Sequence, residues 1–277
     1  MLHYSNEIIK LILKQILISL LLSCIVINNS CAESEGENNK TEERITKSEI
    51  ELLRGRYNPK TSENFVKITS DYALKKSLYL NKEAFEAFLR MAEAAKKDSI
   101  NIYILSATRD FNAQKSIWEA KFNGQRKVGG KNLKKSIINK KDRALKILEY
   151  SSMPGTSRHH WGTDFDIAYS NKNYSKALTN EAYESAEGKA LYLWLEKNAH
   201  KYGFCQPYQD SPEKRNSNIK RGYFEEKWHW SYVPLAKKYL ILYKNNKDLF
   251  KPVGFEGDSF SEEFYMDFVL NISGDCL

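Results

Sequence analysis

Apolar side chains recur along the chain with two periods, and together these predict amphipathic helices interleaved with short strands. The clearest helix follows Asn81, a residue type that caps helices, and extends to Lys97, because apolar residues recur there every three or four positions. The other expected elements are helices over residues 47–53, 112–122 and 187–202 and strands over residues 102–105 and 228–233. This mixture predicts an α+β fold in which helices flank an antiparallel sheet.

The first residues differ from the rest of the chain. Lys10 and Lys14 precede a nearly uncharged apolar run, which is typical of a secretory signal peptide. The run is shorter than the roughly 20 residues that a membrane-spanning helix needs. Small residues predict cleavage after Ala32, whereas residues 21–24 resemble a lipobox in which Cys24 would carry a lipid. Both alternatives place the folded part outside the cytoplasm, and a lipid or an uncleaved signal would attach it to the membrane.

Composition divides the chain into four segments. After the signal peptide at residues 1–32, residues 33–46 have almost no apolar side chains, so we expect them to form a flexible tether. Residues 47–249 are expected to form one domain, since the chain is long enough for one sizeable domain with appendages. The aromatic residues within 250–277 predict a tail that packs on this domain.

The formal net charge of +8 is spread along the chain, with basic clusters such as the one between Lys131 and Lys146. Basic proteins often bind nucleic acid, but an exported chain meets little of it, so we expect no nucleic-acid partner. Attraction to an anionic wall polymer and a merely solvated surface are the two remaining interpretations of this charge.

Two cysteines remain if cleavage follows Ala32, namely Cys205 and Cys276. An oxidising compartment would permit them to pair, and two unpaired buried thiols are the alternative. Their spacing is not that of a pair of metal ligands, so we do not expect a cysteine-ligated metal.

Histidine is scarce, with five in the chain, yet three lie in tryptophan-flanked segments that also hold carboxylates. His159, Asp166 and His229 supply the three ligands that a catalytic zinc ion takes from protein, which leave a position for water. Because side chains alternate along a strand, the odd spacing from His159 to Asp166 requires a turn between a loop and a strand. On spacing alone His160 competes with His159, and Asp164 competes with Asp166.

Hydrolysis at such a metal also needs a group that takes a proton and returns it to the leaving amine. Glu226, three residues before His229, is the expected general base, and Glu225 is the fallback. In an ideal strand this odd offset would point the two side chains apart. We therefore predict a bend or bulge near Lys227, and solvated strand ends are the alternative for both glutamates.

Two motifs in this order carry a family resemblance. The residues are Ser157-x-His159-x-x-Gly162-x-x-x-Asp166 followed by Glu226-x-Trp228-His229-Trp230. The pattern resembles the D-alanyl-D-alanine carboxypeptidase family of zinc peptidases, relatives of the hedgehog-type and lysostaphin-type metal folds. The similarity extends from about residue 65 to residue 239, and it includes Ser106-x-x-Arg109-x-x-x-x-Gln114.

The resemblance implies a role for each matching residue. The Zn²⁺ ligands would be His159, Asp166 and His229, with Glu226 as general base and acid. Arg109 would grip the C-terminal carboxylate of a substrate, which suits a planar guanidinium, although a surface ion pair is the alternative. Ser157 would hydrogen-bond the substrate, and Gln114 would orient the Arg109 clamp or cap a turn.

One position departs from the simplest family pattern, because Asp164 stands where that pattern has alanine. Asp164 lies two residues before Asp166 and hence on the same strand face. It is expected either to orient a ligand histidine or to face solvent.

The function that the resemblance implies is a zinc-dependent peptidoglycan carboxypeptidase, which removes the terminal residue of cell-wall peptides. We expect a monomer in the periplasm or cell envelope. A cell-wall cross-bridge endopeptidase and a noncatalytic zinc-containing wall-binding module are the alternatives. The presence of Glu226 favours catalysis over the binding module, because a structural metal site has no need of a base.

Overall fold

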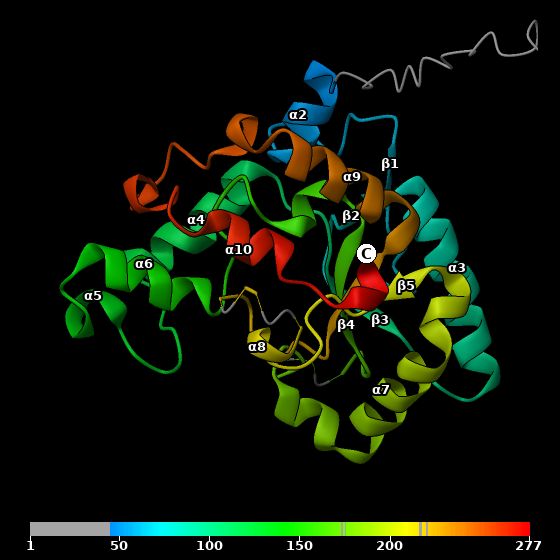
Figure 1. Cartoon of the computed structure of the whole chain (residues 1–277). Helices are drawn as coiled ribbons and strands as arrows, with labels where there is room; N and C mark the ends of the chain where they lie inside the picture. The colour runs from blue at the N-terminus through cyan, green and yellow to red at the C-terminus, as the bar shows by residue number, and fades with distance from the viewer. Residues whose placement is uncertain (1–44, 173, 175, 216–217, 220) are drawn as a thin grey trace, which may run out of the picture. The chain divides into compact units, whose positions relative to one another are not determined.

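The computed structural model describes residues 45–172, 174, 176–215, 218–219 and 221–277 (Figure 1). The predicted signal peptide, the Cys24 lipobox and nearly all of the predicted tether lie outside the described residues. None of the helices in the described part of the chain combines the length and the apolar character needed to cross a bilayer.

The central element is a four-stranded sheet with the order β3-β4-β6-β5, in which all neighbouring strands are antiparallel. Its strands are β3 (Tyr103–Ser106), β4 (Asp164–Ala168), β6 (His229–Tyr232) and β5 (Phe204–Cys205). A separate antiparallel pair consists of β1 (Phe65–Lys67) and β2 (Tyr79–Asn81). Helices surround the central sheet (Figure 1), so the predicted α+β fold with an antiparallel sheet is confirmed.

The predicted helices form with small shifts at their ends. They are α2 (Lys47–Leu53), α3 (Lys82–Lys97), α4 (Phe111–Phe122) and α7 (Ala186–Asn198). The side chain of Asn81 accepts a hydrogen bond from the Glu83 amide, as expected of the cap of α3. Helix α7 continues as the 3₁₀ turn η3 (Ala199–Tyr202), and the chain then leaves the helix at Gly203 with φ of 83°.

Several helices were not predicted from the sequence. The α-helices among them are α5 (Leu133–Ser136), α6 (Lys140–Leu148), α8 (Pro212–Arg215), α9 (Val233–Asn245) and α10 (Tyr265–Leu270). Short 3₁₀ turns complete the described structure, namely η1 (Arg158–Trp161), η2 (Asn180–Glu184), η4 (Lys247–Phe250), η5 (Asp258–Phe260) and η6 (Gly274–Cys276).

Strands β4 and β6 have one apolar and one polar set of side chains, because successive side chains point to opposite faces of a sheet. The apolar set joins residues of α3 and α7 in one hydrophobic cluster and consists of Phe165, Ile167, Trp230 and Tyr232. The polar set, although buried as well, consists of Asp164, Asp166, His229 and Ser231. Burial of the apolar set against two helices therefore fixes which polar groups share the other face.

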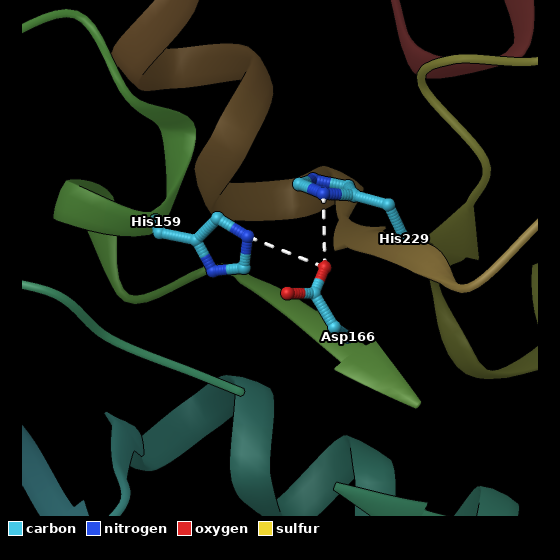
Figure 2. A group of neighbouring side chains, drawn as sticks. All are labelled: His159, Asp166 and His229. Atoms are coloured by element: carbon cyan, nitrogen blue, oxygen red, sulfur yellow. Dashed lines mark ion pairs between the residues drawn. The ribbon is translucent and has the colours of Figure 1, made fainter. Parts of the chain in front are cut away.

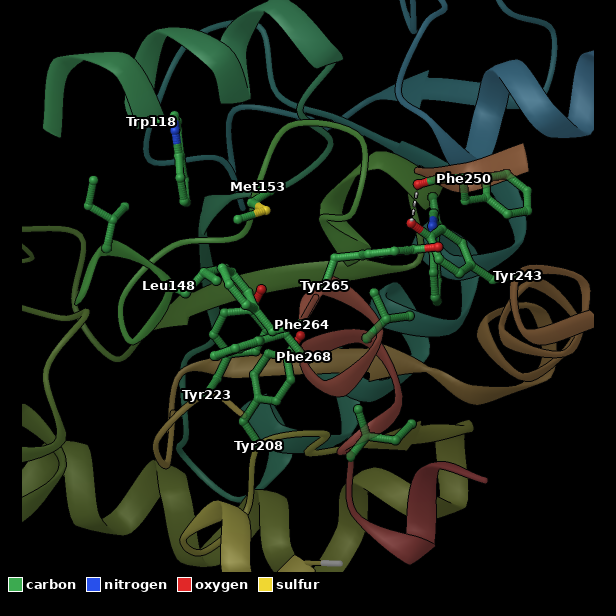
Figure 3. Close-up of a cluster of buried hydrophobic side chains, with 14 of the residues drawn as sticks. Trp118, Leu148, Met153, Tyr208, Tyr223, Tyr243, Phe250, Phe264, Tyr265 and Phe268 are labelled. Carbon is green, nitrogen blue, oxygen red and sulfur yellow. Dashed lines mark hydrogen bonds between the residues drawn. The ribbon is translucent and has the colours of Figure 1, made fainter. Parts of the chain in front are cut away.

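A second hydrophobic cluster contains residues of α4, α6, α9 and the C-terminal segment 250–277 (Figure 3). Aromatic contacts connect this segment to the polar face of the sheet. Phe268 packs on Tyr223, Tyr223 packs on Tyr208, and the ring centroid of Tyr208 lies 4.8 Å from that of His229. The C-terminal segment thus supports one side of His229.

Cys205 of β5 and Cys276 of η6 form a disulfide that joins residues 71 positions apart. Of the two alternatives that the sequence left open, pairing is therefore confirmed and two unpaired buried thiols are excluded. A cross-link of this kind stabilises a protein mainly by restricting the unfolded chain, and the effect grows with the length of the closed loop.

We expect Cys276→Ser to lower the free energy of unfolding by about 2–4 kcal/mol, because the variant loses this restriction. Urea denaturation measures the change. Reduction of the unmodified protein provides a control that leaves the buried side chain in place, and it should lower the stability by a similar amount. Equal stability of the oxidised and reduced forms would contradict the prediction.

Candidate metal centre

Three potential ligands converge on the polar face of the sheet (Figure 2). His159 lies in η1, after which Gly162 turns the chain with φ of 70° into β4. Asp166 of β4 lies directly opposite His229, the first residue of β6. The turn that the spacing of His159 and Asp166 required is therefore present, and strand pairing brings the distant His229 to the same place.

The geometry of the three side chains suits a single cation. Asp166 Oδ1 lies 3.3 Å from His159 Nε2 and 3.3 Å from His229 Nδ1. The ligand atoms of all three residues lie within 4.8 Å of one another, and each residue is at most 4% exposed. Asp166 Oδ1 is buried without a hydrogen-bond partner. Because buried polar atoms are normally satisfied, this orphaned oxygen supports a metal ion at the centre of the group.

The outer nitrogen of each imidazole has its own partner, and this partner sets the tautomer. His159 Nδ1 lies 2.9 Å from the carbonyl oxygen of Ala107, and His229 Nε2 lies 2.9 Å from Asp164 Oδ2. Since a carbonyl and a carboxylate accept hydrogen bonds, these nitrogens carry the proton in a neutral ring. The lone pairs of His159 Nε2 and His229 Nδ1 then face Asp166, as metal binding requires.

His160, which spacing alone could not separate from His159, is not part of this group. Its Nδ1 lies 2.6 Å from the Arg109 carbonyl oxygen, and its Nε2 accepts a hydrogen bond of 3.0 Å from the Gly155 amide. Burial lowers the pKa of His160 to about 3. His160 is therefore a neutral structural residue that ties the Arg109 segment to the turn at Gly155.

Asp164, the first residue of β4, contacts the metal ligand His229 and accepts four hydrogen bonds. Its Oδ2 receives Arg158 Nε at 2.7 Å and His229 Nε2 at 2.9 Å. Its Oδ1 receives Thr163 Oγ1 at 2.6 Å and Ser231 Oγ at 2.8 Å. Burial acts to raise the pKa of Asp164, but the Arg158 charge and these hydrogen bonds outweigh it and hold the pKa well below its ordinary value. Of the two roles expected for Asp164, the structure supports orientation of a ligand histidine.

Glu226 lies beside the metal group rather than on the strand that carries His229. The His229 amide donates to the Glu226 carbonyl oxygen at 3.2 Å across a turn at residues 227–228, so the predicted bend near Lys227 is confirmed. This turn places Glu226 Oε2 3.4 Å from His229 Nδ1. Bonds from the Glu226 amide to the Tyr208 carbonyl and from Gln206 Nε2 to the Glu226 carbonyl hold its backbone.

The metal group opens into a cavity of about 490 Å³, which all three predicted substrate-binding residues line. Arg109 Nη1 donates to Ser106 Oγ at 3.1 Å and lies 3.9 Å from Asp166 Oδ2. Ser157 Oγ is buried without a hydrogen-bond partner. Gln114 Nε2 donates to the Ser152 carbonyl at 2.7 Å, so this side chain holds the 150–152 segment instead of orienting Arg109.

Several charged residues of this cavity were not predicted from the sequence, namely Lys121, Arg126, Glu149, Arg158 and Glu181. Lys121 lies seven residues after Gln114 in α4, which is two helical turns and hence the same helix face. That spacing was the signal available in the sequence. It was hidden among many other lysines of a basic chain.

Comparison with known proteins agrees with these observations. The chain belongs to the VanY family, described as D-alanyl-D-alanine carboxypeptidase, because the model of that family matches residues 77–235. This range contains His159, Asp166, His229 and Glu226.

Two curated relatives and one solved structure are similar to the chain. Putative carboxypeptidase YodJ of Bacillus subtilis is 32% identical over 158 residues, which are 56% of this chain and 46% of that protein. D-alanyl-D-alanine carboxypeptidase of Enterococcus faecium is 26% identical over 230 residues, which are 79% of this chain and 62% of that protein. The LdcB LD-carboxypeptidase structure shows 24% identity and a TM-score of 0.47, covering 73% of this chain and 82% of that one. The chain thus spans only about half to three fifths of the length of the two curated relatives.

We expect Asp164→Asn to lower the affinity for a divalent metal by about 10- to 100-fold, because the amide cannot accept all four hydrogen bonds and releases the His229 ring. Competition between the protein and a chelating dye for Zn²⁺ measures the affinity. Asp71→Asn, at an exposed aspartate outside the cavity, is the matched control. A folded Asp164→Asn protein with unchanged affinity would show that Asp164 does not position the ligand.

Proposed function

We propose that this chain is a zinc-dependent peptidoglycan carboxypeptidase, which removes the C-terminal residue from cell-wall peptides. The observation that carries the proposal is the meeting of His159, Asp166 and His229 beside Glu226 at one end of a cavity. Membership of the D-alanyl-D-alanine carboxypeptidase family supports the substrate class.

Two imidazole nitrogens and one carboxylate oxygen form the ligand set of many catalytic zinc sites, with one further position for water. When bound there, zinc would lower the pKa of that water to about 7 and polarise the carbonyl of the scissile bond. Hydrogen bonds that the outer imidazole nitrogens donate to the Ala107 carbonyl oxygen and the Asp164 carboxylate keep the ligands oriented for this ion.

Glu226 is the general base in this proposal. Its carboxylate lies next to the metal group, its side chain is 18% exposed, and it lines the cavity through which a substrate would enter. It would take a proton from the attacking water and deliver it to the nitrogen of the departing amino acid. The backbone bonds to Tyr208 and Gln206 keep Glu226 in place for both transfers.

Arg109 would bind the terminal carboxylate of the substrate. Its guanidinium is held by Ser106 beside Asp166, and a quarter of the side chain is exposed to the cavity. A planar guanidinium binds a carboxylate through two parallel hydrogen bonds. The unpartnered Ser157 Oγ and Gln114 Oε1 atoms provide further polar groups for the peptide.

The proposal includes export of the protein. The disulfide between Cys205 and Cys276 supports an oxidising compartment, and the N-terminal sequence supports a secretory signal. The folded part would then meet its substrate in the cell envelope. Attachment through a lipid and a monomeric state remain predictions.

We expect the metal-loaded protein to shorten muropeptides by one residue and a chelator to abolish this activity. Glu226→Gln should lose at least about 100-fold in turnover, since it removes the proton acceptor, and it should keep its zinc. Glu225→Gln, which changes the neighbouring carboxylate, is the matched control and should remain active. Mass spectrometry of the digested peptides measures the products.

Three other results would contradict the proposal. Cleaved cross-links would support an endopeptidase instead, and unchanged muropeptides would support a noncatalytic binding module. Full activity of Glu226→Gln would show that another group serves as the base.

A further inference from the structure

The cavity contains a buried cation that the reaction described above does not use. Lys121 is only 6% exposed and lines the same cavity as the metal group. Its Nζ donates to Ser151 Oγ at 2.5 Å and lies 3.5 Å from the Tyr150 carbonyl oxygen. Within the described part of the chain, no carboxylate forms an ion pair with it.

Such an environment is unusual for a lysine. Buried charges are generally paired with an opposite charge, because an unpaired charge loses its hydration without compensation. Burial, together with the positive charges of Arg126 and Arg109, lowers the pKa of Lys121 to about 8, and the Glu226 carboxylate opposes this shift only in part. An ammonium group has three hydrogens to donate, and the two neutral oxygens leave one of them for a ligand.

Charge is distributed unevenly around this cavity. Lys121 of α4 and Arg126, which follows α4, are basic residues on one part of the lining. Glu181 of η2 and the pair Glu225 and Glu226 supply carboxylates from other segments. A further carboxylate of the lining, Glu149, is already bound to Lys146 at 2.6 Å. A bound peptide would therefore be stabilised if it presented a negative group to Lys121.

We propose that Lys121 is a second anion-binding position in the substrate cavity, which receives a carboxylate other than the terminal one bound by Arg109. This inference rests on the proposed peptidase function. It narrows the substrate class to peptides with a free carboxylate on a residue shortly before the scissile bond. Arg126, which is exposed and also lines the cavity, adds positive charge on the same part of the lining.

A purely structural role is the alternative, because Lys121 and Gln114 both hold the 150–152 segment against α4. The two roles differ in what they predict for substrates. Loss of a structural contact would weaken all peptides equally. Loss of an anion-binding position would weaken only peptides that carry the second carboxylate.

The test uses pairs of peptides that end in a free carboxylate and differ only in having Glu or Gln at one of the three residues before the scissile bond. In at least one pair, the metal-loaded protein should prefer the Glu peptide by about 10- to 100-fold in kcat/KM. Lys121→Met should remove most of this preference while changing kcat/KM for the Gln peptide little. Lys121→Arg should retain part of the preference, since it keeps the charge.

Lys115→Met is the matched control, because Lys115 lies in the same helix but outside the cavity, and it should keep the preference. Provided that the unmodified protein cleaves the peptides, equal losses on both peptides of every pair in Lys121→Met, or no preference in the unmodified protein, would overturn the inference.

A binding measurement separates this inference from the proposed function. Calorimetry compares binding of the same peptides to the metal-loaded Glu226→Gln protein with and without the additional Lys121→Met substitution. If the unmodified protein cleaves neither peptide but binding of the Glu peptide depends on Lys121, the peptidase function fails and the anion-binding position stands. If peptides are cleaved but binding shows no dependence on Lys121, the function stands and the anion-binding position fails.

Discussion

The antiparallel pairing of β4 with β6 is the constraint on which the rest of the structure depends. This register sets Asp166 opposite His229 and Asp164 opposite Ser231, so the metal group and its supporting network lie side by side on one face. A shift by one residue would turn Asp166 and Asp164 toward the apolar cluster. The aromatic side chains of both strands, buried against α3 and α7, resist such a shift.

Burial gives the polar face its chemical character. Asp164 is fully buried, and so it must be satisfied by hydrogen bonds, which come from Arg158, His229, Thr163 and Ser231. These bonds determine which nitrogen of His229 faces Asp166. The residue that departs from the simplest family pattern thus defines the orientation of a ligand. The Arg158 charge, together with these hydrogen bonds, explains how the Asp164 carboxylate can remain charged in this interior.

The sequence predicted most of the fold that positions the metal group, because strong apolar periodicity marks α3 and short apolar runs mark β3 and β6. It could not predict α6, whose buried Ala144, Ile147 and Leu148 lie within a stretch dominated by lysines. Nor could spacing separate His159 from His160. That distinction depends on contacts with Ala107, Arg109 and Gly155, which only the folded chain brings together. Lys121 was missed for the same reason, since its significance comes from burial and not from its type.

The metal content of the purified protein tests most directly whether the two imidazoles and Asp166 hold one ion. Elemental analysis after dialysis against trace zinc should find a single ion per chain in the unmodified protein and almost none in Asp166→Asn, while His160→Gln should retain the metal if it folds. Equal metal content in the unmodified protein and Asp166→Asn, or no metal in either, would contradict the metal centre and the chemistry proposed for it.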